Sequence, residues 1–171
     1  MELYPAIDIR NGRVVRLTRG EADAETAYHP DPVAMAERFA WQGARWIHIV
    51  DLDRAFGDGD NIAVVDRLLT RVGSHVRIQL GGGIRTAEDV ARLGETLVAR
   101  LVLGTAVVER PELVAEAVAA VGPHRIAVAL DVRDGLVATR GWTATSARTA
   151  ESVVQEVAGH GVRTVVYTDI A

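Results

Sequence analysis

The chain of 171 residues contains no cysteine and no lysine, and each absence removes a class of chemistry. Without cysteine there is no disulfide framework and no thiolate nucleophile, which suits a reducing compartment. All 19 basic residues are arginines, so a mechanism that needs a lysine Schiff base is excluded. The five histidines are scattered without metal-ligand spacing. We therefore expect no metal site and interpret His48 as a packed or solvated residue.

Three further features are missing. The N-terminus has neither a basic segment nor an adequate apolar segment of a signal peptide, and no uncharged apolar run of about 18 residues exists. Strong positive charge is also missing, because the net charge is −4 and the pI is about 5.7. We therefore expect a cytoplasmic protein with neither a nucleic-acid nor a membrane partner. With 49% hydrophobic and 25% charged residues, the chain is long enough for one well-filled core.

Short β-rich runs alternate with helical patterns along the chain. Each run is followed by Asp or Gly, and the runs end near Ile7, Val50, Leu80, Leu103, Leu130 and Thr168. The amphipathic stretches between them cover residues 32–42, 62–72, 86–93, 111–121 and 150–159. Such alternation is typical of right-handed βαβ units around a parallel sheet. We therefore predict six parallel strands and five helices, with a small hairpin at residues 14–17.

Two segments near the start recur near the end. Asp8–Val14 resembles Asp131–Val137, and residues 43–52 resemble residues 161–170. Two copies of a unit of roughly 120 residues imply a parent of roughly 240, near the ~250 residues of a (β/α)8 barrel. We therefore expect one incomplete domain over residues 1–171, with halves that start near residues 1 and 124. It would be an α/β fold, a (β/α)8 barrel cut to about three quarters.

Carboxylates stand at corresponding strand ends of the two halves. Two interpretations of Asp8 and Asp131 are open: each caps the following turn, or the two serve as a general acid and a general base. Recurrence in both repeats raises the weight of the catalytic interpretation. Asp51 and Asp169 form a second pair, with Thr168 beside the latter. For Asp51 we favour a structural role in hydrogen bonding loop amides.

The strongest local motif is the run of three glycines, Gly81–Gly83, between a predicted strand and a capped helix. Amides of such a loop can approach an anion closely at a helix N-terminus. A tight turn with positive φ is the alternative, although one glycine would suffice for it. Gly104 and Thr105 follow the next strand and could contribute to the same phosphate site. Trp142 could stack on a planar ligand or simply cover the mouth of the barrel.

Six segments together resemble one enzyme family. They read PAIDIRNGRVVRL, WIHIVDLDRAF, LGGGIRT, LGTAVVE, ALDVRDG and VYTDI, and the match runs from Met1 to Ala171. The family is that of the histidine-biosynthesis isomerases acting on phosphoribosylformimino-aminoimidazole-carboxamide ribotide, including a dual histidine and tryptophan relative. The sister cyclase is less similar, because it carries a cysteine where this chain has Ile7.

The resemblance implies an aldose–ketose isomerase, an intramolecular oxidoreductase. It would convert an aminoaldose to an aminoketose by an Amadori rearrangement of a phosphorylated ribotide, without metal or cofactor. By resemblance, Asp8 matches the proton acceptor and Asp131 the proton donor, and Thr168 and Asp169 support them. Gly82, Gly83, Gly104 and Thr105 match one phosphate site of the family. The residues that we predict to contact phosphate or substrate also include Gly81, Arg19 and Trp142.

Family members continue past the sixth strand and carry a second phosphate site there. Two hypotheses for this chain therefore stand side by side. One is an isomerase, and the other is an inactive or complementation-dependent fragment that acts as a phosphosugar-binding or assembly module. Unpaired strand edges also predict a homo-oligomer, formed through residues 3–9 and 163–168.

Overall fold

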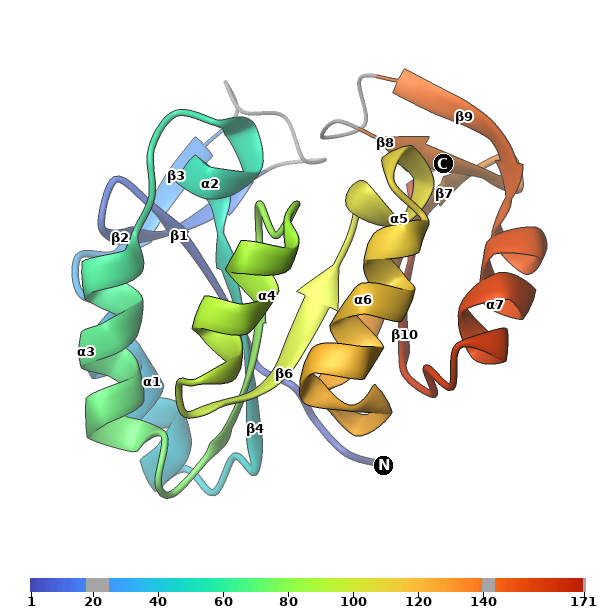
Figure 1. Ribbon diagram of the computed structural model, residues 1–171. Coiled ribbons are helices and arrows are strands. Elements are labelled where there is room, and N and C mark those ends of the chain that lie inside the picture. The colour runs from blue at the N-terminus through green and yellow to red at the C-terminus, as the bar shows by residue number, and fades with distance from the viewer. Residues whose placement is uncertain (18–24, 140–143, 171) are drawn as a thin grey trace. The chain divides into compact units, whose positions relative to one another are not determined.

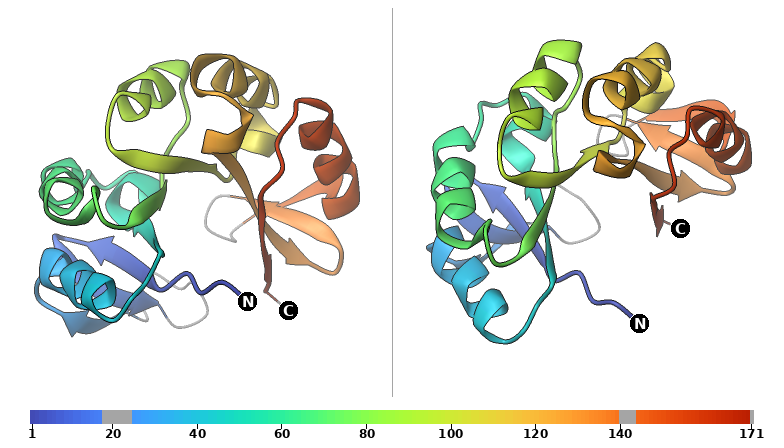
Figure 2. Two further views of the ribbon diagram at one scale, coloured as in Figure 1. Left: turned by 90° about the horizontal axis from the view of Figure 1, so that it is seen from below. Right: turned by 60° about the horizontal axis from the view of Figure 1, so that its bottom comes forward.

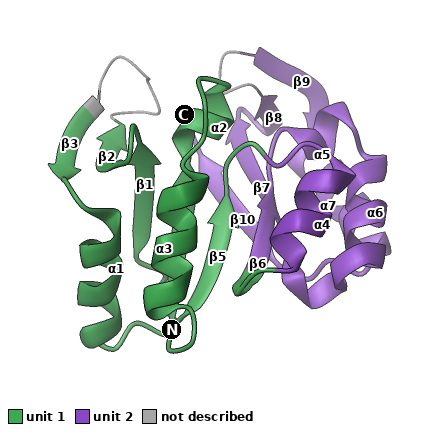
Figure 3. Cartoon of the chain, turned by 60° about the vertical axis from the view of Figure 1, so that its left-hand side comes forward, with its two compact units in different colours: residues 1–83, 96–99 green, residues 84–95, 100–171 purple. Residues whose placement is uncertain are grey.

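The computed structural model describes residues 1–17, 25–139 and 144–170, and Figure 1 shows the order of their helices and strands. Arg19 and Trp142, two of the predicted substrate contacts, lie outside the described residues. The chain forms two compact units, coloured in Figure 3. The first consists of residues 1–83 and 96–99, and the second of residues 84–95 and 100–171. The two units are therefore described one at a time.

The first unit is built on a sheet with the strand order β3-β2-β1-β4-β5. Its strands are β1 (Ala6–Arg10), β2 (Arg13–Leu17), β3 (Glu25–His29), β4 (Trp46–Asp51) and β5 (Arg77–Gly81). β1, β4 and β5 pair in parallel, whereas β2 and β3 add antiparallel strands beside β1. The β1–β2 turn places Asn11 and Gly12 at φ +50° and +72°, the left-handed conformation that favours Asn-Gly in two-residue hairpins.

Helices α1 (Pro32–Trp41) and α3 (Ile62–Val72) lie side by side in this unit (Figure 2), and the short α2 (Leu52–Phe56) follows β4 directly. α1 begins as predicted, because the Asp31 side chain accepts a hydrogen bond from the Val33 amide and proline occupies the first turn. α3 buries Val65, Leu68, Leu69 and Val72, a spacing that places all four on one face.

The second unit contains the strands β6 (Val98–Leu103, in this unit from Arg100 onward), β7 (Ile126–Arg133), β8 (Leu136–Thr139), β9 (Ala144–Thr149) and β10 (Val165–Asp169). β7 pairs in parallel with β6 and β10, and antiparallel with β8. The helices are α4 (Ala87–Gly94), α5 (Ala106–Glu109), α6 (Glu112–Val121) and α7 (Ala150–Gly159), with the 3-10 turn η1 (Pro123–Arg125). α4 carries the predicted capping box between Thr86 and Asp89.

The six predicted strands correspond to β1, β4, β5, β6, β7 and β10, and the five predicted helices to α1, α3, α4, α6 and α7. Parallel pairing is confirmed for the pairs described within each unit. The short helices α2 and α5 and the β8–β9 extension were not predicted. The β7–β8 turn repeats that of the first unit, with Asp134 at φ +52° and Gly135 at φ +79°. In the part of the chain described, no helix is long and apolar enough to cross a membrane.

Alternation along the strands separates a helix-covered face from a polar face in the first unit. Ile7, Ile9, Ile47, Ile49 and Ile78 are fully buried on the helix side. Leu80 pairs with Ile49, so Ile7 and Leu80 both lie on the helix side of the sheet. The predicted open edge at residues 3–9 is wrong for its last two residues, because Asp8–Arg10 pair with β2.

Candidate active site

Asp8 lies in the middle of β1, on the face opposite the buried isoleucines. Its register partners are Val50 on β4 and Val15 on β2, so the strand is held on both sides at this residue. Pairing on both sides leaves the β1 backbone little freedom to shift at Asp8. The starting point of the Asp8 side chain is therefore fixed, as the positioning of a general base requires.

The half-buried position of Asp8 changes its acidity. Burial raises the pKa of Asp8 above the ordinary value of 3.8, and the nearby positive charge of Arg16 partly opposes that rise. A carboxylate with a raised pKa binds a proton more strongly and is therefore a better base. Asp8 thus combines a fixed backbone with increased basicity.

Asp131 occupies the corresponding position on β7 in the second unit and is also half-buried. Its register partner on β10 is Thr168, whereas Asp169 is opposite Val132. Because side chains alternate between the faces of a sheet, Thr168 shares the face of Asp131 and Asp169 belongs to the other face, where it is exposed. The structure therefore brings Thr168, but not Asp169, to Asp131. Asp8 belongs to the first unit and these residues to the second.

The glycine run has a structural explanation. Gly82 and Gly83 have φ values of +99° and +65°, so both adopt backbone conformations that disfavour a side chain. A Cβ atom at Gly82 would lie 2.2 Å from the carbonyl oxygen of Asp51, and one at Gly83 would lie 2.5 Å from that of Arg54. Both glycines are thus needed where the loop after β5 passes close to the backbone of Asp51 and of Arg54 in α2. The argument that one glycine would suffice for the turn is wrong, and phosphate binding by this loop stays a prediction.

Gly104 and Thr105 connect β6 to the short helix α5 in the second unit. A Cβ atom added at Gly104 would meet no atom of the described residues within 4 Å, and its φ is not left-handed, so neither crowding by these residues nor strain explains the glycine. Thr105 stands at the start of α5, and its side chain makes no capping hydrogen bond. The backbone around Gly104 thus leaves open space next to the turn, as a phosphate contact there would require.

A buried polar cluster was missed at the carboxyl end of β4. Asp51, Asp53 and Asn61 are only 3%, 6% and 5% exposed. Asp51 accepts hydrogen bonds from the amides of Arg54 and Asn61, at 3.2 and 2.9 Å, which confirms its predicted role in binding loop amides. The Asn61 side chain donates to Asp51 at 2.7 Å and to Asp53 at 2.9 Å. Asn61 immediately precedes α3, so its sequence position suggested only a helix cap.

His48 lies on the polar face of the first unit, and its Nδ1 is 3.0 Å from Nε2 of the buried Gln79. Burial lowers the pKa of His48, because the charged imidazolium loses solvation there. This agrees with the interpretation of His48 as a packed residue. Among the described residues, no group of three or more His, Asp or Glu side chains is arranged to hold a metal ion.

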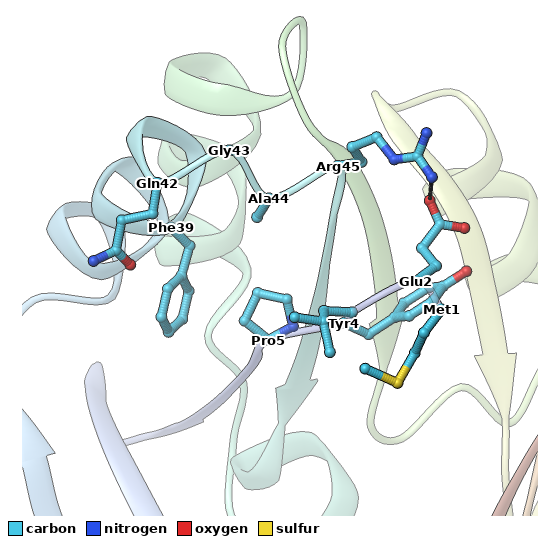
Figure 4. A pocket seen from close by; sticks show the side chains of 10 residues that line it. Met1, Glu2, Tyr4, Pro5, Phe39, Gln42, Gly43, Ala44 and Arg45 are labelled. Carbon is cyan, nitrogen blue, oxygen red and sulfur yellow. Dashed lines mark ion pairs between the residues drawn. The ribbon is translucent and has the colours of Figure 1, made fainter.

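A cavity of about 550 Å³ lies at the other end of the first unit (Figure 4). Residues 1–5, Phe39 and residues 42–45 line it, and these precede β1 and β4, so the cavity is at the amino ends of the strands. Glu2 pairs there with Arg45 at 2.8 Å. Beside this ion pair, the rings of Tyr4 and Trp46 stack with their centroids 5.4 Å apart. The Cζ atom of Arg77 lies 4.4 Å from the centroid of the Trp46 ring. Asp8 is not among the lining residues, and the carboxylate that is, Glu2, is ion-paired.

Comparison with known proteins gives matches along nearly the whole chain. A family model described as "Histidine biosynthesis protein" matches residues 2–171. A protein of Thermomicrobium roseum is 47% identical over 171 residues, which cover 99% of this chain and 70% of the relative. One from Geobacillus thermodenitrificans is also 47% identical, with 99% and 68% covered. One from Roseiflexus castenholzii is 45% identical, with 100% and 71% covered. All three are named 1-(5-phosphoribosyl)-5-((5-phosphoribosylamino)methylideneamino)imidazole-4-carboxamide isomerase.

Proposed function

Because the chain belongs to the histidine biosynthesis protein family, we propose that it is the isomerase of the phosphoribosyl-imidazole-carboxamide ribotide. The observation that carries this proposal is the 47% identity, across 99% of the chain, to relatives named as that isomerase. The reaction would be an Amadori rearrangement of the aminoaldose to the aminoketose. A cytoplasmic location stays a prediction.

The reaction needs an acid and a base in separate steps. Protonation of the ribose ring oxygen breaks its bond to C1, while the nitrogen lone pair forms the C=N bond of an iminium ion. A base then removes the proton from C2, and the electrons of that C–H bond move to give an enolamine. Return of a proton to C1 and loss of the hydroxyl proton complete the aminoketose. Two carboxylates in different surroundings can divide these tasks.

We assign the two tasks to Asp8 and Asp131. The raised pKa of Asp8 suits the base that removes the C2 proton. Asp131 would donate the proton to the ring oxygen, and Thr168, its register partner on β10, would hold the reacting hydroxyl beside it. Phosphate contacts from Gly82, Gly83, Gly104 and Thr105 would bind the substrate far from the reacting carbon and keep it in register.

A turnover assay with the ribotide substrate tests the proposal. The purified chain should convert the aminoaldose to the aminoketose. Asp8→Asn and Asp131→Asn should each lower kcat by about 10²–10⁴-fold, with a smaller change in KM, because binding would depend mainly on the phosphates. The alternative, a phosphosugar-binding module, predicts ribotide binding in a calorimeter without any turnover. Near-normal kcat in either variant removes that aspartate from the mechanism.

We also propose that copies of the chain associate through β10. Val165 and Tyr167 are 38% and 58% exposed on this strand, whereas their register partners Val128 and Leu130 on β7 are fully buried. A second copy that covers these apolar side chains would remove them from water. Light scattering at micromolar concentration should give a mass above that of the monomer, and Tyr167→Glu should reduce it. A monomeric wild-type chain would refute this proposal.

A further inference from the structure

Two hairpins, β1–β2 and β7–β8, each follow a candidate catalytic aspartate, and their two-residue turns are alike. The β1–β2 turn, Asn11-Gly12, comes three residues after Asp8, and the β7–β8 turn, Asp134-Gly135, comes three residues after Asp131. The first two turn residues of each hairpin have left-handed φ values. The two turns nevertheless differ in what holds them.

The Asn11-Gly12 turn is anchored to the buried polar cluster. The amide of Asn11 donates to Oδ2 of Asp53 at 2.8 Å, and the amide of Gly12 donates to Oδ1 of Asn61 at 2.9 Å. For the Asp134-Gly135 turn, the hydrogen bond seen in the described part of the chain is at a carbonyl, where Gly135 accepts from the Ala150 amide at 3.2 Å. Among residues 1–17, 25–139 and 144–170, no buried side chain accepts the amides of this second turn, which nevertheless has the same left-handed φ values. The hydrogen bonds from the first turn to Asp53 and Asn61 are therefore not required for this turn conformation.

Asn61 is the centre of this anchor. Its Nδ2 donates to both Asp51 and Asp53, and it lies 3.4 Å from the carbonyl oxygen of Ile9 on β1. Its Oδ1 meanwhile accepts from Gly12. The amide can be oriented in only one way, because the reverse would put its oxygen against two carboxylates and its NH₂ group against an N–H donor. Asn61 thus joins the end of β4 to the end of β1.

The Asn61 side chain also does not make the helix-capping hydrogen bond that its position favours. Asparagine is a preferred N-cap residue, and Asn61 stands at the N-cap of α3, yet its side chain makes no capping hydrogen bond. The neighbouring Asp60 accepts from the Ile62 amide at 3.0 Å instead. Asp60 thus accepts a hydrogen bond at the start of α3, whereas the Asn61 side chain binds the β1–β2 turn.

We propose that Asn61 is a positioning residue for Asp8, fixing the β1–β2 turn so that the carboxylate keeps one orientation toward the substrate. The inference rests on the proposed isomerase function, in which Asp8 is the base. Misplacement of a reacting group by about 1 Å can cost about 100-fold in rate. A neutral side chain suits the task, since it bridges two carboxylates without adding charge.

Two variants of Asn61 and one control test the proposal. Asn61→Ala removes the whole anchor, and Asn61→Asp keeps the volume but loses the Nδ2 donors. Asp60→Ala is the control, because it removes a bond at the start of α3 without contacting the turn. Both Asn61 variants should lower kcat by about 10- to 100-fold at nearly unchanged KM, and Asp60→Ala should leave both close to wild type. Amide resonances of Asn11 and Gly12 should shift, while those of Asp134 and Gly135 should not.

Three outcomes would overturn the inference. The first is a folded Asn61→Ala variant with the kcat of the Asp60→Ala control. The second is unchanged Asn11 and Gly12 resonances. The third is failure of both Asn61 variants to fold, since the side chain would then serve the fold itself. Absence of turnover in the wild-type chain would refute the proposed function without deciding the role of Asn61. The carboxyl resonance of Asp8 then tests the positioning, and it should move in Asn61→Ala but not in Asp60→Ala.

Discussion

Substitution of Gly82 by alanine should destabilise the protein strongly, although alanine adds only one methyl group. The new Cβ would lie 2.2 Å from the carbonyl oxygen and 2.7 Å from the amide nitrogen of Asp51. Both contacts are to backbone, so no side-chain rotation can relieve them. The left-handed φ of +99° adds a conformational cost of about 1–2 kcal/mol. Overlap in a packed region adds about 1–3 kcal/mol, so we expect a loss of about 2–5 kcal/mol.

Urea denaturation followed by circular dichroism measures this loss. Gly104→Ala is the matched control, because within the described part of the chain its Cβ would meet no atom within 4 Å and its φ is not left-handed. The control should stay within about 0.5 kcal/mol of wild type. A similarly small effect for Gly82→Ala would refute the close approach between β5 and the β4–α2 connection. For the same reason, Gly104 is the better position at which to test phosphate binding.

Three other results are expected. Burial raises the pKa of Asp8, so the folded state gains stability from protonated Asp8 below the unfolded value of 3.8 and loses it as pH rises through the folded pKa. Asp8→Asn should therefore raise Tm more near pH 7 than near pH 4 in calorimetry. Thr168→Val should lower kcat roughly tenfold or more, whereas Asp169→Asn should stay near wild type, because only Thr168 shares the face of Asp131. Thr86→Ala should cost about 1 kcal/mol in urea denaturation by removing the α4 cap, and Thr86→Ser should recover most of it.

Periodicity was sufficient to predict β1, β4, β5, β6, β7 and β10 and the helices α1, α3, α4, α6 and α7. Continuous apolar runs gave the strands that are covered by helices, and the i, i+3, i+4, i+7 pattern of α3 is plain in the sequence. The α/β alternation, and the (β/α)8 class predicted from the internal repeat, agree with the family to which the chain belongs. The β8 strand could have been predicted too, because Asp134-Gly135 carries the same turn signal as Asn11-Gly12.

Other features depend on contacts between distant residues and have no local signal. The need for both Gly82 and Gly83 arises from the backbone of Asp51 and Arg54, which is near in space and far in sequence. Asn61 looks like an ordinary helix cap until its partners on β1 and β4 are known. The strand register decides on which face of the sheet Ile7 and Leu80 lie, and an uninterrupted apolar run does not reveal that register.

The aromatic stack at the amino end of the first unit provides an intrinsic tryptophan fluorescence signal for that end of the unit. Trp46 is 5% exposed between Tyr4 and Arg77, whereas Trp41 is 88% exposed at the end of α1. Iodide should therefore quench the emission of Trp41 and spare that of Trp46. Replacing Trp41 and Trp142 with phenylalanine would leave Trp46 as the remaining tryptophan, so that its emission follows the docking of residues 1–5 against β4.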